Sequence, residues 1–130
     1  MNRPRYLHAP TTLPPAWSIL ETREDGKCYG HRPSGLTVIW SREVHPEAYF
    51  GHGGVAERVW LHVSVAHPRR DPTWAEIREI KCMFLGPEAK AIMVLAAESE
   101  WVNIHGHCFH LFCPADGDVL PDFTRGSGSL

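Results

Sequence analysis

Regular alternation of apolar and polar residues predicts strands along much of the chain. The clearest is residues 59–65, in which valines and a leucine occupy the odd positions and Trp60, His62 and Ser64 the even ones. Because successive side chains of a strand point to opposite faces of its sheet, one face of this strand belongs to a core and the other is mixed aromatic and polar. Residues 36–41 are β-branched and aromatic, which also predicts a strand.

Residues 91–97 are apolar at every position, which predicts an interior strand covered on both faces. The short polar segment 98–100 follows directly. A connection of this length joins antiparallel neighbours, so we expect the next strand to pair with this one.

A single helix is expected between residues 73 and 84. Thr73 and Glu76 have the spacing of a capping box, in which each side chain bonds to the other residue's backbone N–H. Apolar residues recur every three or four positions, which predicts a stripe packed on the core. The stripe consists of Trp74, Ile77, Ile80 and Phe84.

Residues 101–113 (WVNIHGHCFHLFC) contain three of the nine histidines and two of the four cysteines. The apolar positions are even before Gly106 and odd after it, which indicates one extra residue in a β-bulge there. A tight turn at Gly106 would also explain the change. With a bulge, polar and thiol side chains share one face, and Trp60 and His62 join them if both strands lie in one sheet. The later residues of that face are Asn103, His105, Cys108 and His110.

These elements predict an α+β fold in the order ββαββ, with a four-stranded, mainly antiparallel sheet and the helix packed on one face. Residues 1–35 are rich in Pro and Gly and are expected to form an irregular N-terminal arm. Residues 36–126 would form a single α+β domain that ends in an irregular C-terminal segment, and residues 127–130 a frayed tail. A chain of 130 residues is long enough for one such core.

Composition narrows the classes of function. The 13 basic and 15 acidic residues give a net charge of −2, which disfavours a protein that grips nucleic acid through phosphates. The longest apolar run is too short to cross a membrane, and the N-terminus lacks the apolar core of a signal peptide, so we expect a cytoplasmic protein. The four cysteines form no C-x-x-C pair, and free thiols are therefore expected.

Several short motifs follow one another between residues 58 and 126: WLHVS at 60–64, PTW at 72–74, VNIH at 102–105, HL at 110–111 and LPDFTRG at 120–126. Their order and spacing resemble a family of small uncharacterised proteins of phage and bacterial genomes, a domain of unknown function. The resemblance implies a phage or prophage origin, a compact domain without a required cofactor, and an accessory role in binding a host or phage component.

A metal site is the sharpest enzymatic hypothesis. His105 and His107 stand at i and i+2, so on a regular strand they point the same way and can share a zinc ion. His110, His62 or Cys108 could complete the ligand set. Such a metal would lower the pKa of a bound water and support a hydrolase or nuclease. A bulge at Gly106 would turn His105 and His107 apart, however. We therefore expect no cofactor, with zinc on His105, His107 and His110 as the alternative.

Nucleophilic catalysis is a weaker hypothesis. Ser64 and His62 can be combined with an acidic residue, but Ser64 stands in the middle of a strand without the sharp turn that exposes such a serine. Cys108 near His105 or His110 would be a thiolate without recognisable oxyanion donors.

A sheet face with Trp, His and Asn and few charges has the composition of an interface core. We therefore expect a small phage-type accessory protein that acts by protein–protein binding, without catalysis, on a host or phage protein or by homodimerisation. An anti-defence or host-modulating role is one form of this expectation. The expected binding face consists of Trp60, His62, Asn103, His105 and His110.

Overall fold

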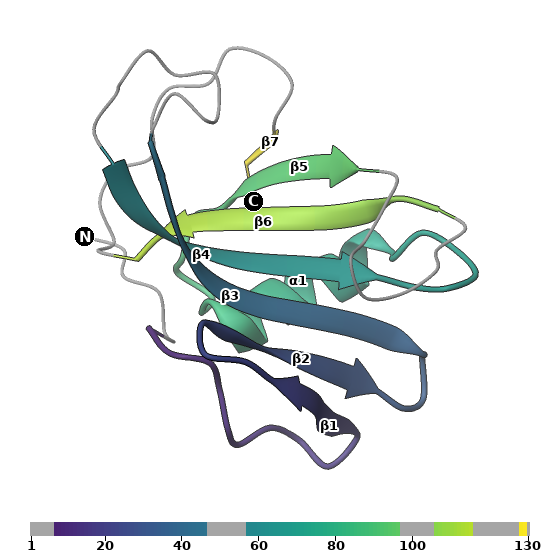
Figure 1. Ribbon diagram of the computed structural model, residues 1–130. Helices are drawn as coiled ribbons and strands as arrows, with labels where there is room; N and C mark the ends of the chain where they lie inside the picture. Colours follow the sequence, from purple (N-terminus) through teal and green to yellow (C-terminus); the bar gives the residue numbers. More distant parts are fainter. Residues whose placement is uncertain (1–6, 47–56, 97–105, 116–127, 130) are drawn as a thin grey trace.

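The computed structural model of the protein describes residues 7–46, 57–96, 106–115 and 128–129 (Figure 1). In this part of the chain every strand belongs to one sheet. The strands are β1 (Trp17–Thr22), β2 (Gly26–His31), β3 (Leu36–Pro46), β4 (Glu57–Ala66), β5 (Ile92–Ala96), β6 (Cys108–Pro114) and the two-residue β7 (Gly128–Ser129). The one helix of the described residues, α1 (Trp74–Phe84), follows β4.

The strands lie in the order β1-β2-β3-β4-β6-β5-β7, and all neighbours are antiparallel. β3 and β4 form the longest ladder, with ten residue pairs from Thr37↔Ala66 to Pro46↔Glu57. β4 therefore lies between β3 and β6, and α1 crosses behind the sheet on its far side in Figure 1.

The expectation of a four-stranded sheet in ββαββ order, preceded by an irregular arm, is wrong. Six strands of five or more residues make up the sheet, because β1 and β2 within residues 17–31 extend it beyond β3. The Pro and Gly residues of this segment punctuate strands rather than prevent them, since a strand needs only five or six residues between turns. Gly26 illustrates this, because a side chain there would collide with the Trp40 carbonyl oxygen across the ladder.

The main core lies between α1 and the sheet face that α1 covers. The predicted odd positions of β4, among them Leu61, Val63 and Val65, are fully buried there. Phe84 of α1 packs edge-on against Tyr29 of β2, with ring centroids 4.8 Å apart. An N-terminal strand that appeared irregular in the sequence therefore supplies part of the core.

The capping box at the start of α1 is confirmed. The Glu76 backbone N–H donates to Thr73 Oγ1 at 3.1 Å, and the Thr73 backbone N–H donates to Glu76 Oε1 at 2.9 Å. Ile77, Ile80 and Phe84 of the predicted stripe are buried, but Trp74 is 52% exposed and rests edge-on against Phe109. The stripe therefore begins one turn later than predicted, because the first helical residue extends past the edge of the core.

The predicted strand 91–97 is present as β5 and pairs antiparallel with the next described strand, as expected, but that strand, β6, begins at Cys108 rather than directly after residues 98–100. β5 is also not covered on both faces along its length, because Leu95 is 51% exposed. In β6 the odd positions Phe109, Leu111 and Cys113 face the main core and are buried, which is the parity predicted for them. The segment that would contain a bulge before Gly106 falls outside the described residues. Each of the four cysteines is a thiol rather than half of a disulfide.

Candidate functional site

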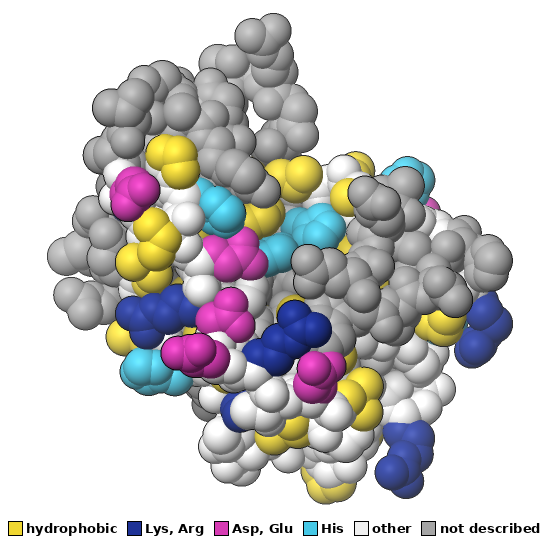
Figure 2. Space-filling model, in the orientation of Figure 1, with side chains coloured by type: hydrophobic (Ala, Val, Ile, Leu, Met, Phe, Trp, Pro, Cys, Tyr) yellow, Lys and Arg dark blue, Asp and Glu magenta, His cyan; other side chains and the backbone are white. Residues whose placement is uncertain are grey.

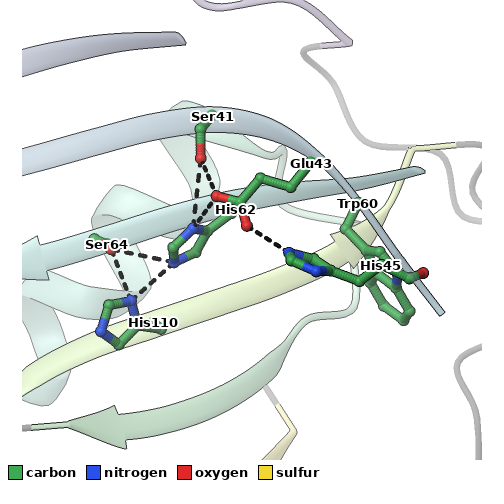
Figure 3. Close-up of polar contacts among 7 residues, drawn as sticks. All are labelled: Ser41, Glu43, His45, Trp60, His62, Ser64 and His110. Carbon is green, nitrogen blue, oxygen red and sulfur yellow. Dashed lines mark hydrogen bonds and ion pairs between the residues drawn. The ribbon is translucent and has the colours of Figure 1, made fainter. Parts of the chain in front are cut away.

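The sheet face opposite α1 carries a cluster of polar side chains, which we call the histidine face. It is formed at the centre of the sheet by alternate residues of β3, β4 and β6, because residues two apart on a strand point to the same side. Cross-strand pairing aligns Ser41 with His62, and Ser64 with His110. In Figure 2, which looks onto this face, histidine and acidic side chains gather near its middle. The cluster consists of Ser41, Glu43, His45, His62, Ser64 and His110 (Figure 3).

Glu43 accepts hydrogen bonds from three side chains. The Ser41 hydroxyl donates to Glu43 Oε2 at 2.6 Å, and His62 Nδ1 lies 2.7 Å from the same oxygen. His45 Nε2 lies 2.7 Å from Glu43 Oε1. An ionised carboxylate only accepts hydrogen bonds, so the ring nitrogens of both histidines that face Glu43 carry hydrogen.

A second group of contacts joins β4 to β6. His62 Nε2 lies 2.8 Å from His110 Nδ1, and the Ser64 hydroxyl oxygen lies 3.1 Å from the first atom and 2.8 Å from the second. The chain Glu43–His62–Ser64–His110 is therefore continuous, with every step within hydrogen-bond distance.

The positions of the hydrogen atoms along this chain can be assigned by starting from the Glu43 carboxylate. The Nδ1–H of neutral His62 donates to Glu43, so the Nε2 of His62 is an acceptor. The Ser64 hydroxyl can donate a hydrogen bond to this nitrogen. Ser64 Oγ then accepts from His110 Nδ1–H. With its hydrogen on Nδ1, neutral His110 has a lone pair on Nε2.

The protonation states agree with this arrangement. Burial, reinforced by the charge of His62 when protonated, lowers the pKa of His110 to about 4, and Glu43 opposes this only in part. Burial alone would raise the pKa of Glu43, but hydrogen bonds from His62, Ser41 and His45 and the charge of His62 outweigh it and hold that pKa well below its usual range. At neutral pH, Glu43 is therefore ionised and His110 is uncharged.

A small apolar cluster on the same face holds the histidine rings. Phe112 stacks on His62 with ring centroids 4.3 Å apart and planes 5° apart. Trp60 and Ile92 are fully or almost fully buried beside Phe112. Trp60 also donates its indole N–H to the His45 carbonyl oxygen at 3.2 Å (Figure 3). The imidazoles are therefore fixed by packing as well as by hydrogen bonds.

The polar cluster forms one wall of a pocket of about 750 Å³. Ile39 and Ala96 contribute apolar surface, and Asp25 and Lys27 line the pocket from the β2 side. His110 uses Nδ1 for the network, and its Nε2 forms no hydrogen bond with the described residues (Figure 3). Within the described chain Trp40 Nε1 is the one buried side-chain nitrogen or oxygen without a partner, so His110 Nε2 is accessible rather than sealed.

Ser64, His62 and Glu43 have the connectivity of a serine–histidine–acid triad, but the serine cannot act as its nucleophile. Ser64 is only 4% exposed, and its hydroxyl lies between two imidazoles. No sharp turn presents it to the pocket, since it stands in the middle of β4. Among the imidazole nitrogens of His62 and His110, the one left accessible and without a hydrogen bond to the described residues is His110 Nε2.

Of the residues expected to form a binding face, the structure brings Trp60, His62 and His110 onto one side of the sheet, and Asn103 and His105 lie outside the described residues. Trp60 is fully buried, so it supports the site rather than contacting a ligand. His110 and His62 are the members that line the pocket.

The proposed zinc ligands are not seen together. His107 lies away from His110, where its backbone N–H and its Nδ1 bond to the Asp71 carboxylate at 2.6 and 3.3 Å. His105 lies outside the described residues. Within the described part of the chain, no group of three His, Cys, Asp or Glu side chains is arranged to hold a metal ion.

Sequence reasoning missed the acidic end of the network. The predicted strand ended at residue 41, whereas β3 continues to Pro46. The signal was present in the alternation of Ser41, Glu43 and His45, which matches the alternation of polar residues on β4.

Fold and site together define a domain built on one antiparallel sheet, with a helix on one face and a polar pocket on the other. Residues 54–116, a little under half of the chain, match the family described as a domain of unknown function, DUF7694. The predicted resemblance to an uncharacterised domain family is thereby confirmed; the LPDFTRG motif lies beyond the matched residues. No curated protein and no solved structure matches the chain. Among the described helices, none is long and apolar enough to span a membrane.

Proposed function

We propose that the protein is a binding domain whose pocket on the histidine face takes a small polar ligand. The observation that carries the proposal is the accessible His110 Nε2, held by a buried network at the wall of a pocket of about 750 Å³. Sites for small molecules have volumes of this order and combine apolar walls with a few fixed polar groups.

The chemical class of the ligand follows from His110 Nε2, the atom that it would contact. Uncharged His110 offers a lone pair, so the ligand group that fits is a hydrogen-bond donor such as a hydroxyl or an amide N–H. The side chains that line the pocket include both signs of charge, in Arg23, Lys27, Asp25 and Glu43, which favours a ligand with no large net charge.

A fragment experiment tests this proposal. ¹⁵N-labelled protein would be titrated with small alcohols and amides, each paired with a methyl-capped analogue that lacks the donor hydrogen. We expect donor fragments to shift the backbone signals of Ser64 and His110, the capped analogues to bind more weakly, and His110→Ala to abolish the shifts. His107→Ala, far from the pocket, is the matched control and should bind as the parent protein does.

The proposal fails if no fragment shifts the pocket signals or if capped and uncapped fragments bind equally well. Shifts centred on Trp74 instead would identify a different surface.

A protein partner is the second candidate, and one observation favours it. Trp74 and Leu95 are each about half exposed on the α1 side of the sheet, where Trp74 rests on Phe109 and Leu95 pairs with Phe109 across the ladder. Large exposed side chains of this type are typical of contact surfaces. In this form the protein would be the phage-type accessory protein expected from the sequence, and its partner could be a host protein or a second copy of the chain. Trp74→Ser should then weaken self-association in sedimentation experiments, or partner binding, without affecting the pocket.

A further inference from the structure

We propose that His110 acts as a general base in this pocket and that Ser64, His62 and Glu43 form the relay that takes up its proton. The inference rests on the proposed function in one respect, since the substrate is taken to be the hydroxyl-bearing ligand of the same pocket. It adds an activity to binding: the removal of the hydroxyl proton.

The geometry supports every step of the relay. The gaps are 2.8 Å from His110 Nδ1 to Ser64 Oγ, 3.1 Å from Ser64 Oγ to His62 Nε2 and 2.7 Å from His62 Nδ1 to Glu43 Oε2. A direct contact of 2.8 Å between His62 Nε2 and His110 Nδ1 offers a shorter route that bypasses the serine.

The proton transfer is balanced within these groups. The O–H bond of the ligand breaks, its electron pair stays on oxygen, and an N–H bond forms at His110 Nε2. The hydrogen on His110 Nδ1 then passes to Ser64 as the Ser64 hydroxyl hydrogen passes to His62 Nε2. His110 and Ser64 end uncharged, and the positive charge resides on His62 beside the Glu43 carboxylate.

The relay resolves a physical conflict in the site. A half-buried imidazole that resists protonation is a weak base when it acts alone. The Glu43 carboxylate contacts His62 Nδ1 at 2.7 Å and provides a counter-ion there, whereas His110 Nδ1 contacts a serine and a histidine. His110 is therefore the catalytic residue, since its Nε2 takes the proton from the ligand, and the other three, which act through it, are positioning residues.

Carbethoxylation by diethyl pyrocarbonate tests the relay without a known substrate. The reagent acylates an unprotonated imidazole nitrogen: a C–N bond forms at Nε2, and the C–O bond to the ethyl carbonate leaving group breaks. For His110 to end uncharged, its Nδ1 proton must leave through the same relay. The rate at each histidine is read by peptide mass spectrometry, and His107, bonded to Asp71 elsewhere, is the internal control.

We expect His62→Gln to slow acylation of His110 by at least about tenfold, a modest fraction of what a positioned base contributes, and to leave His107 unaffected. Ser64→Ala should slow it less, because the direct contact between the two imidazoles remains. His31→Gln is the matched control, since it makes the same exchange at a histidine of β2 that bonds to Ser34 and does not line the pocket. An unchanged rate at His110 in His62→Gln would overturn the proposal.

Imidazole ¹⁵N spectra of the parent protein give a second measurement that does not depend on whether a variant folds. At neutral pH, His110 should carry its hydrogen on Nδ1 and none on Nε2, and His62 should carry hydrogen on Nδ1. A hydrogen on His110 Nε2 would contradict the relay. If fragments bind but His62→Gln does not slow acylation of His110, the pocket function stands and the relay is rejected. If His62→Gln slows acylation but no fragment binds, the relay stands and the proposed ligand class is rejected.

Discussion

The two faces of the sheet are built from the same strands but are held together by different kinds of interaction. On the α1 side, alternate residues of β4 and β6 are apolar and almost fully buried, and the contacts there are between hydrocarbon surfaces. On the histidine face, the intervening residues of the same strands and alternate residues of β3 contact one another through a carboxylate, three imidazoles and two hydroxyls. The α1 side therefore determines whether the chain folds. The polar groups of the histidine face determine what the folded chain can bind, because substituting them changes little apolar burial.

The largest expected effect is on the α1 side. Leu61→Ala removes a fully buried side chain from the main core and should lower the free energy of unfolding by about 2–5 kcal/mol, because it loses apolar burial and leaves a cavity. Urea unfolding followed by circular dichroism measures the change. A loss of similar size from His110→Gln at neutral pH would contradict the division of roles between the faces.

An intermediate effect concerns pH and belongs to the histidine face. The folded protein lowers the pKa of His110 from 6.5 to about 4, so the unfolded chain binds the proton more readily. The stabilisation is therefore complete above pH 6.5 and is lost as the pH falls from 6.5 towards 4. Because His110 is only partly buried, we expect this loss to be no more than about 2 kcal/mol.

The urea midpoint, measured at several pH values within this window, gives the slope of stability against pH. His110→Gln should flatten it, whereas His107→Gln should retain it. The carboxyl of Glu43 adds a separate loss only below its ordinary pKa, because its folded-state pKa is lowered. A slope unaffected by His110→Gln would show that another group dominates the acid response.

The smallest expected effect concerns α1, the helix that covers one of the two faces. Thr73→Ala removes the side-chain half of the capping box and should cost about 1 kcal/mol in the free energy of unfolding. Thr73→Ser preserves the acceptor and should cost less. Neither variant should change the reactivity of His110, and a change would show that α1 is coupled to the opposite face.

The sequence predicted what depends on local pattern. The alternation in residues 59–65, the capping box at Thr73 and the parity of β6 from Phe109 to Cys113 were all readable, because each depends on neighbours along the chain. β1 and β2 were missed because their short strands lie between Pro and Gly residues, and because their stability comes from pairing with β3.

The candidate site was only half predictable for the same reason. Trp60, His62 and His110 could be assigned to one face from parity. The alternation of Ser41, Glu43 and His45 could have extended the strand, but not the contact of Glu43 with His62, because this contact depends on the register of β3 with β4, which pairs Glu43 with Trp60. Register is a property of two strands together, and no single segment of the sequence contains it.

The near-parallel stack of Phe112 on His62, with planes 5° apart, has a consequence for spectroscopy. Hydrogens held above the plane of a benzene ring are magnetically shielded by its circulating electrons. The carbon-bound ring hydrogens of His62 should therefore resonate upfield of those of an unstacked histidine. The signal of this imidazole is in this way marked by the fold itself, without an isotope or a probe attached to the chain.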